Sequence, residues 1–125
     1  MIPDNKISKW KVKLNNFDKN SNNILIGIGP DNPKNKNNFY NECFTFSCLQ
    51  SMVVLKSEQF SEYNGNSGKL KKDDIIEVII DRINGNLSFA VNDINYGIVN
   101  CEIKKDSILY PIIIIYDQDQ QVKLV

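Results

Sequence analysis

Apolar and polar residues alternate in short runs along most of the chain, and this period of two is typical of β-strands. Near the amino terminus, three apolar residues alternate with three lysines: Trp10, Val12 and Leu14 with Lys9, Lys11 and Lys13. The pattern predicts a strand with one buried face and one solvent face. Because no stretch of ten or more residues shows an apolar helical face, we expect an all-β domain.

Two runs are apolar at successive positions rather than at alternate ones. Residues 24–29 read Ile-Leu-Ile-Gly-Ile-Gly, as expected for a central strand covered on both faces. Its glycines are expected where neighbouring atoms approach closely. The run Ile112–Ile115 is likewise expected to be core, inside a strand covered on both faces, because its exposure would promote aggregation.

Further strands are predicted from short alternating or β-branched runs that are bounded by turn residues. They are expected over Phe44–Cys48, Met52–Leu55, Ile75–Asp81, Leu87–Val91, Tyr96–Val99, Leu109–Tyr116 and Gln121–Val125. Two stretches, 30–38 and 57–69, are rich in Asn, Gly, Lys, Pro or Ser, and we expect both to be long exposed loops.

Turn residues suggest how these strands connect. Asn84-Gly85 is the dipeptide best suited to the positive φ angles of a tight hairpin turn, and it separates Ile75–Asp81 from Leu87–Val91. Residues 92–95 are expected to turn the chain into its next strand, and residues 117–120 to join the last two strands as a pair. Short strands with frequent turns predict a sandwich of two sheets.

Length and charge narrow the class of protein. The 125 residues suffice for one ordinary core, so we expect a single domain over 1–125. Lys and Arg total 15 and Asp and Glu total 15, which leaves no field to attract nucleic-acid phosphates or anionic lipid. No apolar run is long enough to cross a bilayer, and the first residues do not resemble a signal peptide. We therefore expect no nucleic-acid partner and no membrane insertion.

The cysteine and histidine content bears on metal sites and compartment. Cys43, Cys48 and Cys101 are odd in number and form no Cys-x-x-Cys pair, and the chain has no His. A disulfide framework and a structural zinc site are both disfavoured, and we expect no cofactor and no metal. Cys48 lies in an alternating run and is predicted to be a small buried hydrophobe. An intracellular, reducing compartment such as the cytoplasm fits this cysteine usage best.

Catalysis is not expected, so no catalytic residue is assigned. The absence of His removes Ser-His-Asp and Cys-His chemistry. The carboxylate pairs Asp73-Asp74 and Asp117-x-Asp119 stand where acidic residues commonly form solvated turns. A calcium-assisted lectin remains an alternative, because Asp31, Asn32, Asp117 and Asp119 offer loop oxygens, although the chain has no dense acidic calcium loop.

Several segments follow one another in a characteristic order: Asp73–Asp81 (DDIIEVIID), Gly85–Asp93 (GNLSFAVND), Gly97 and Leu109–Pro111 (LYP). In this order and spacing they resemble an SPRY domain. The resemblance extends from Trp10, in the position of the first conserved strand of the family, to the closing residues 122–124. Within it, Leu87, Phe89 and Val91 are expected to form one inward face, Tyr110-Pro111 to start a core strand, and Asp81 and Asn92 to bond turn backbone.

The resemblance implies a bent, jelly-roll-related sandwich of two antiparallel sheets. It also implies a non-enzymatic protein–protein interaction module that presents loops at one edge to a peptide or a folded partner. A purely structural role, as a packing domain of a large assembly, is the alternative within the same family. Because the chain has no Trp after the Leu-Tyr-Pro strand and no Arg-rich segment, the peptide specificity of known SPRY domains is not carried over.

Candidate binding residues follow from loop positions that the family uses. They are Tyr63 and Asn64 in one loop, Tyr116, Asp117 and Gln118 in a second, and Asp31 and Asn32 in a third. Tyr suits such a role because it offers a stiff apolar ring with a polar tip.

The amino-terminal end departs from the family pattern. Only nine residues precede Trp10, where SPRY domains have further strand-forming sequence, so the chain is either an excised piece or a minimal version. Missing strands would leave an edge at 10–14 that could pair with a strand of another chain, and Lys9, Lys11 and Lys13 could guard that edge.

Overall fold

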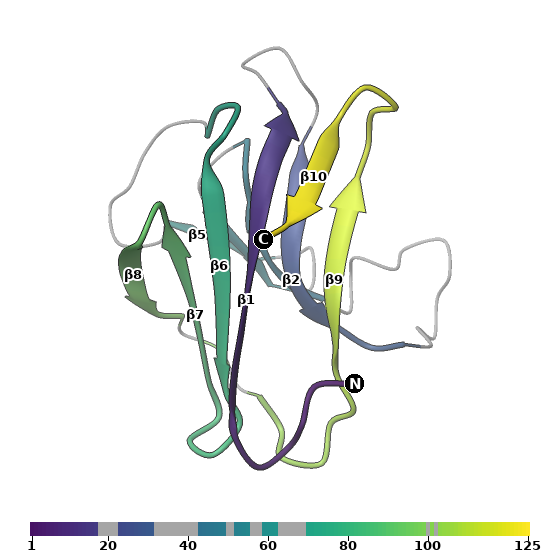
Figure 1. Ribbon diagram of the computed structural model, residues 1–125. Coiled ribbons are helices and arrows are strands. Elements are labelled where there is room, and N and C mark those ends of the chain that lie inside the picture. Colours follow the sequence, from purple (N-terminus) through teal and green to yellow (C-terminus); the bar gives the residue numbers. More distant parts are fainter. Residues whose placement is uncertain are drawn as a thin grey trace.

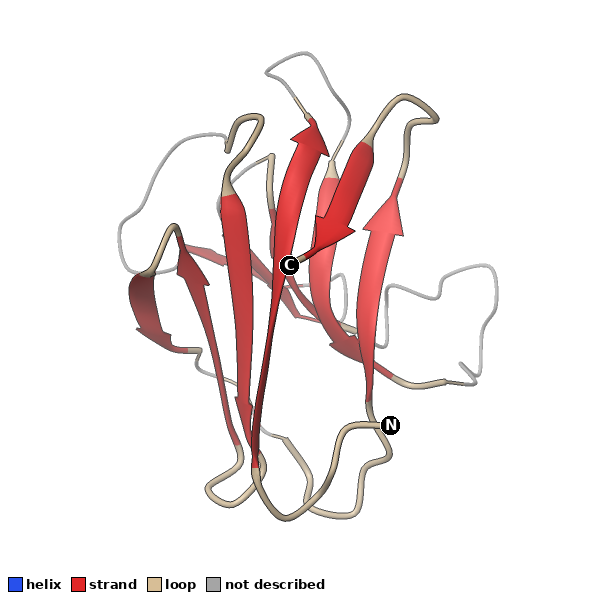
Figure 2. Ribbon diagram, in the orientation of Figure 1, coloured by secondary structure: helices blue, strands red, loops and turns tan. Residues whose placement is uncertain are grey.

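The computed structural model describes residues 1–17, 23–31, 43–49, 52–55, 59–62, 70–99, 101 and 103–125, with only the backbone described in 52–55 and 59–62. The strands of this described part are β1 (Ile7–Asn16), β2 (Ile24–Gly29), β3 (Phe44–Ser47), β4 (Met52–Leu55), β5 (Gln59–Glu62), β6 (Ile75–Asp81), β7 (Asn86–Val91), β8 (Ile94–Ile98), β9 (Tyr110–Ile115) and β10 (Gln121–Leu124). No helix occurs among the described residues (Figure 2).

The strands form two antiparallel sheets that pack face to face (Figure 1). Sheet A has the strand order β10-β1-β6-β7-β8, and sheet B has the order β5-β4-β3-β2-β9. The core between them contains large side chains that are fully buried: Val12, Leu14, Phe17, Ile24, Ile26, Ile28, Phe46, Ile76, Ile80, Leu87 and Phe89. The rings of Phe46 in sheet B and Phe89 in sheet A lie 5.6 Å apart between centroids. The predicted all-β antiparallel sandwich is confirmed.

β1 has the two faces that its alternation predicts. Val12 and Leu14 are fully buried and Trp10 packs against the core, whereas the lysines lie on the opposite face. The strand pairs with β6 over Ile7–Lys13 and with β10 over Val12–Asn16. The hypothesis of an open edge at 10–14 is therefore wrong, because β1 is an internal strand whose neighbours occupy both sides.

β2 is the central, doubly covered strand that its sequence predicts. All six of its residues are buried, and it lies between β3 and β9. A Cβ atom at Gly27 would lie 2.0 Å from the carbonyl oxygen of Phe44, so only glycine fits at this close approach. The prediction for this strand is confirmed in both its position and its use of glycine.

The hairpin of β6 and β7 is confirmed, but its turn differs from the predicted one. Asp81 pairs with Asn86, which leaves a loop at 82–85 in which Gly85 alone has a positive φ, of 73°. The Asp81 carboxylate accepts hydrogen bonds from the main-chain N–H groups of Ile83 and Asn84, both at 3.0 Å, as expected of this residue.

The tight two-residue turn occurs instead between β7 and β8. Val91 pairs with Ile94, and the two residues between them, Asn92 and Asp93, have φ angles of 50° and 69°. Two successive positive φ angles are what a type I′ hairpin turn requires. β8 therefore begins at Ile94, two residues earlier than the sequence predicts.

Two further expectations about connections are wrong. β9 pairs with β2 and β10 pairs with β1, so the last two strands belong to different sheets and do not pair with each other. Residues 59–62 form β5 instead of loop. The rest of the predicted loop 57–69 and the range 32–38 of the other predicted loop lie outside the described residues.

The isoleucine run of β9 is not enclosed on both faces. β9 is the last strand of sheet B, and Pro111, Ile113 and Ile115 pair with Ile28, Ile26 and Ile24 of β2. Directly paired residues share a face, so these β9 side chains point to the core side of sheet B. Nevertheless Pro111 is exposed, and Ile113 and Ile115 are 36% and 41% exposed. The expectation that the run is core is wrong, because β9 is an edge strand that sheet A covers incompletely.

The end of the sandwich opposite the β1–β2 connection is held by the single arginine of the chain. Arg82 is 2% exposed, and its Nη2 atom donates to the carbonyl oxygens of Lys105 and Ser107 at 3.0 and 2.8 Å. These bonds attach the segment that precedes β9 to the β6–β7 hairpin.

Candidate functional site

Three turns lie at one end of sheet A, which we call the loop end: 71–74, 92–93 and 116–120. The strand registers place them there. Asn16, the last residue of β1, pairs with Gln121 at the start of β10, and Lys13 pairs with Ile75 at the start of β6. Ile76 pairs with Val91, the last residue before the turn 92–93. The loop end therefore combines segments that are far apart in the sequence.

The turn 116–120 is fixed by the side chain of its last residue, Gln120. The Gln120 Oε1 atom accepts hydrogen bonds from the main-chain N–H groups of Tyr116 and Asp117 at 3.2 and 3.1 Å. The main-chain N–H of Gln120 donates to the carbonyl oxygen of Asp117 at 3.3 Å. Gln120 is only 6% exposed, so this arrangement is shielded from water and strongly restricts the backbone.

The same turn is also attached to sheet A and presents its side chains outward. The Asn16 side-chain amide donates to the carbonyl oxygen of Asp119. Tyr116 is 51% exposed, Gln118 is exposed and Asp117 is half-buried. The result is a large aromatic side chain on a backbone that is held in place before any partner arrives.

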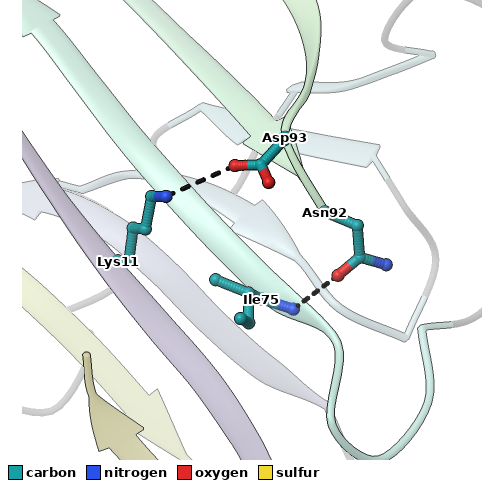
Figure 3. A network of polar contacts seen from close by, with 4 residues as sticks. All are labelled: Lys11, Ile75, Asn92 and Asp93. Carbon is teal, nitrogen blue, oxygen red and sulfur yellow. Dashed lines mark hydrogen bonds and ion pairs between the residues drawn. The ribbon is translucent and has the colours of Figure 1, made fainter.

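The turn 92–93 connects three strands of sheet A through polar contacts (Figure 3). The Asn92 side-chain oxygen accepts a hydrogen bond from the main-chain N–H of Ile75 at 3.0 Å. The Lys11 ammonium lies 3.3 Å from the Asp93 carboxylate. In the neighbouring turn 71–74, the Asp73 carboxylate lies 3.7 Å from the Lys13 ammonium. Both ion pairs are solvated, so each contributes no more than about 1 kcal/mol.

Asp74 anchors the turn 71–74 from a buried position. Its carboxylate accepts hydrogen bonds from the main-chain N–H of Lys71 at 2.9 Å and from the Asn92 side-chain amide at 3.0 Å. The main chains of β1 and this turn also bond each other, from Asp73 N to Leu14 O at 2.7 Å. The adjoining turns 71–74 and 92–93 are therefore tied together through one carboxylate and one amide.

Two of the thiols are less acidic than a free cysteine because they are buried. Burial raises the pKa of Cys48, the Asp74 charge raises it further, and burial also raises the pKa of Cys101. All three cysteines lie in the described part of the chain, and none of them forms a disulfide. Cys48 is fully buried in the core, which confirms its predicted role as a small hydrophobe.

The structure brings some of the predicted site residues together and separates others. Tyr116, Asp117 and Gln118 share the turn just described. Asp31 is exposed but follows Gly29, which pairs with Tyr110, whereas Ile24 pairs with Ile115 beside that turn. Asp31 therefore lies beyond the opposite end of the β2–β9 ladder, which is about 17 Å long.

The remaining predicted residues, Tyr63, Asn64 and Asn32, lie outside the described residues. Glu62, which precedes Tyr63 in sequence, pairs with Met52, and the row continues through Ser47 and Leu25 to Ile114. Glu62 is thus level with the end of β9, about 19 Å across sheet B from it.

The oxygens considered for a calcium site do not converge as a set, because Asp31 and Asp117 lie at opposite ends of the ladder. Within the described ranges, no group of three His, Cys, Asp or Glu side chains is placed to hold a metal ion.

Sequence reasoning missed the residues that shape the loop end. Gln120 and Asn16 carry no signal in the sequence. Asn92 is expected to bond turn backbone, and Asp74 is expected in a solvated turn, whereas the structure buries its carboxylate against Lys71 and Asn92.

No helix found in the part of the chain that the structure describes is long and apolar enough to cross a membrane.

Solved structures of SPRY domains are similar to this chain. The SPRY domain of human HERC1 superposes with a TM-score of 0.71 and 15% sequence identity, over 96% of this chain and 74% of that one. Another human SPRY domain gives a TM-score of 0.69 and 12% identity, over 93% of this chain and 74% of that one. No family model matches the sequence, and no curated protein sequence matches it. The chain therefore has the SPRY fold, as its motifs predict.

Proposed function

We propose that this chain is a non-enzymatic protein-binding module that holds a peptide or a folded protein at its loop end. The SPRY fold supports this role, since SPRY domains generally serve as protein-interaction modules. The observation that carries the proposal is the structure of the turn 116–120. Two hydrogen bonds to the Gln120 side chain hold its backbone, and the Tyr116 side chain is half exposed. An aromatic side chain on a backbone that is already held in place loses less entropy on binding than one on a mobile loop, which makes it a good interface anchor.

The proposed contact surface is centred on Tyr116, Asp117 and Gln118. We include Tyr63 and Asn64 in it, because Glu62 is level with the end of β9. Asp31 and Asn32 are not part of this central contact, since Asp31 lies at the other end of the ladder. We further propose that residues 1–125 act as one domain in a reducing intracellular compartment, which suits three cysteines that form no disulfide.

The test compares the proteins captured by three forms of the chain from a lysate of its source organism. The forms are wild type, Tyr116→Ala, and Ile83→Ala as a matched control. Ile83 is also a large exposed hydrophobic residue, but it lies in the β6–β7 turn at the opposite end of sheet A. Mass spectrometry identifies the captured proteins, and thermal unfolding confirms that all three forms fold.

We expect partners that wild type and Ile83→Ala capture and that Tyr116→Ala loses. Truncating a central interface Tyr typically weakens binding by about 2 kcal/mol or more, which is roughly thirtyfold. Equal capture by all three forms would place the interface elsewhere and contradict the proposed surface.

A permanent packing role in a larger assembly is the second candidate. The exposure of Ile113 and Ile115 on β9 and of Leu124 on β10 favours this packing role, because monomeric proteins seldom expose several aliphatic side chains together. A partner that co-purifies in fixed stoichiometry and survives high salt would distinguish this role from reversible binding.

A further inference from the structure

The side of the sandwich that carries β9 and β10 exposes side chains that point inward. Ile113 and Ile115 share the core face of sheet B, as their register with β2 shows. Leu124 pairs with the buried Val12 and therefore shares the core face of sheet A, yet it is 66% exposed. Both edge strands lie on the same side of the sandwich in Figure 1. We call Ile113, Ile115 and Leu124 the lateral seam.

The main chain of β9 has hydrogen-bonding groups that point away from sheet B. In an antiparallel ladder the N–H and C=O of one residue point to the same side, and successive residues alternate. The Ile24 carbonyl accepts from Cys48 N at 3.0 Å, on the β3 side, so Ile24 turns its polar groups away from its β9 partner, Ile115. Ile24 and Ile115 are thus a non-hydrogen-bonded pair, and the polar groups of Ile115 point to the outer edge.

The same reasoning applies two residues earlier, at Ile113. It also explains why Pro111 is accepted in β9, because a proline fits an edge strand when its nitrogen faces outward. In the described residues no strand pairs with this edge, and no main-chain bond from outside the sheet reaches Tyr110–Ile115. Ile113 and Ile115 therefore offer two N–H donors and two carbonyl acceptors in line.

The chain itself already uses the start of this edge. Leu109 has the same parity as Ile113, and its carbonyl oxygen accepts a hydrogen bond from the main-chain N–H of Ile2 at 2.8 Å. Ile2 is buried and belongs to the core cluster. At Leu109, therefore, another segment already bonds the outer edge through its main chain and buries an apolar side chain, that of Ile2. The outward-facing groups of Ile113 and Ile115 continue the same edge.

Two other edge strands, β8 and β10, are poorer templates for an added strand. β8 has irregular pairing with β7 between Ser88 and Ala90, and Gly97 has a φ of 96°. β10 has four residues, and one of them is Lys123. By contrast, β9 pairs with β2 at six successive positions without a bulge and carries no charge. Charges and bulges are the usual protection of an edge against pairing.

We propose that the outer edge of β9 accepts an extended segment of a partner protein as a sixth strand of sheet B. The segment exchanges main-chain hydrogen bonds with Ile113 and Ile115. Its residues opposite these two share their face, so aliphatic side chains at alternate positions of the segment enter the lateral seam beside Leu124. This inference goes beyond the proposed function, because it uses the strand edge rather than the Tyr116 turn.

A second copy of the chain fits this edge less well than a single segment. Two β9 strands that pair antiparallel about Ile113 would bring Leu109 of one copy opposite the turn 116–120 of the other. Ile2 already covers the edge at Leu109, so the two occupied ends would collide. A partner segment without such ends meets no obstacle, and dimerisation is therefore an outcome that the test separates.

The test uses a fluorescent synthetic peptide with valine at every second position and threonine or lysine between. Its control is the same peptide with N-methyl groups on the amides that would face β9. Binding is measured by anisotropy with wild type, Ile113→Pro and Ile113→Ala. Proline at 113 removes the outward N–H, as Pro111 does naturally, and also loses the isoleucine side chain. Alanine shortens the side chain too but keeps that N–H, so the difference between the two variants reports the main-chain bond.

Binding of the peptide is expected to weaken about tenfold in Ile113→Pro and less in Ile113→Ala, and the N-methyl peptide should not bind. Hydrogen exchange of the wild-type protein gives an independent readout, should Ile113→Pro fail to fold. With peptide, the amides of Ile113 and Ile115 gain protection, whereas those of Ile112 and Ile114, which already bond β2, stay unchanged.

Any of four results would overturn the proposal. These are no binding at about 1 mM peptide, equal binding of the N-methyl peptide, equal affinities of Ile113→Pro and Ile113→Ala, or a wild-type dimer that uses β9. None of them alters the expected loss of partners in Tyr116→Ala, so the two hypotheses fail separately.

Discussion

Replacing Gln120 by alanine should loosen the turn that presents Tyr116. The Gln120 side-chain oxygen accepts two main-chain hydrogen bonds, at 3.2 and 3.1 Å, from a position that is 6% exposed. Each such bond contributes about 0.5–1.5 kcal/mol, so Gln120→Ala is expected to lower the free energy of unfolding by about 1–3 kcal/mol. Gln120→Glu is the matched control, because a carboxylate retains an acceptor oxygen for both N–H groups.

Urea unfolding measures this loss through the fluorescence of Trp10, the single tryptophan, which packs against the core. Hydrogen exchange then locates the loss. The amides of Tyr116 and Asp117 should exchange much faster in Gln120→Ala, whereas those of the distant β6–β7 hairpin should exchange faster only as far as the loss of global stability requires. Unchanged protection of the Tyr116 and Asp117 amides would refute the reasoning, since the hydrogen bonds to the Gln120 side chain would then not be what holds the turn.

Three further predictions concern the rest of the fold. Gly27→Ala should destabilise the protein by about 3 kcal/mol or more, because the new Cβ would lie 2.0 Å from the Phe44 carbonyl oxygen in a doubly buried strand; an unchanged thermal midpoint would contradict the predicted clash. Arg82→Ala should lower the free energy of unfolding in urea by about 3 kcal/mol, since a buried guanidinium that donates to two carbonyl oxygens is lost. The segment before β9 should then become susceptible to proteolysis, and resistance equal to wild type would argue against this anchor. Hydrogen bonds from the Asn84 side chain, and then from main-chain N–H groups, lower the pKa of Asp81, so its contribution to stability is present above its unfolded pKa and is lost as the pH falls through its folded pKa. Asp81→Asn should therefore flatten the acid limb of the stability curve, and a variant with the same acid limb as wild type would rule out Asp81 as its source.

The strands that sequence predicts best are those whose signal is local. Residues 24–29 carry their own explanation, because an apolar run with two glycines fits only a covered strand with close neighbours. Alternation likewise gives both faces of β1. Which strands pair depends on contacts that no window of sequence contains, so β9 and β10 look like a hairpin although they complete different sheets.

Turn chemistry shows a similar limit. Asn84-Gly85 is the better dipeptide for a two-residue turn, yet the carboxylate of Asp81 bonds the next two N–H groups and stabilises a longer loop. The tight turn forms at Asn92-Asp93 instead, where the Asn92 side-chain oxygen accepts a hydrogen bond from the main-chain N–H of Ile75 in the neighbouring strand. The distant partner offsets the strain of two positive φ angles, and sequence alone does not reveal it.

The candidate site is predictable only in part for the same reason. Position within the SPRY pattern names Tyr116–Gln118 as candidates, which stays a prediction. The supporting contacts of Gln120 and Asn16 follow only from the structure, in which β10 lies beside β1. The exposure of Ile113 is also a property of the assembled sheets, since the same isoleucine in a central strand would be buried.

The pairing of β1 with β10 has a consequence for biosynthesis. Among the described strands, β1 is the first to be synthesised and β10 the last. One side of β1 therefore stays without its neighbour until β10 has left the exit tunnel, so sheet A closes only after all its other strands have been synthesised. Pairings between such distant segments also fold slowly, on a timescale of about milliseconds to seconds. Until β10 emerges, a nascent chain of this domain would thus expose one edge of β1, and chaperone capture in that interval would protect it.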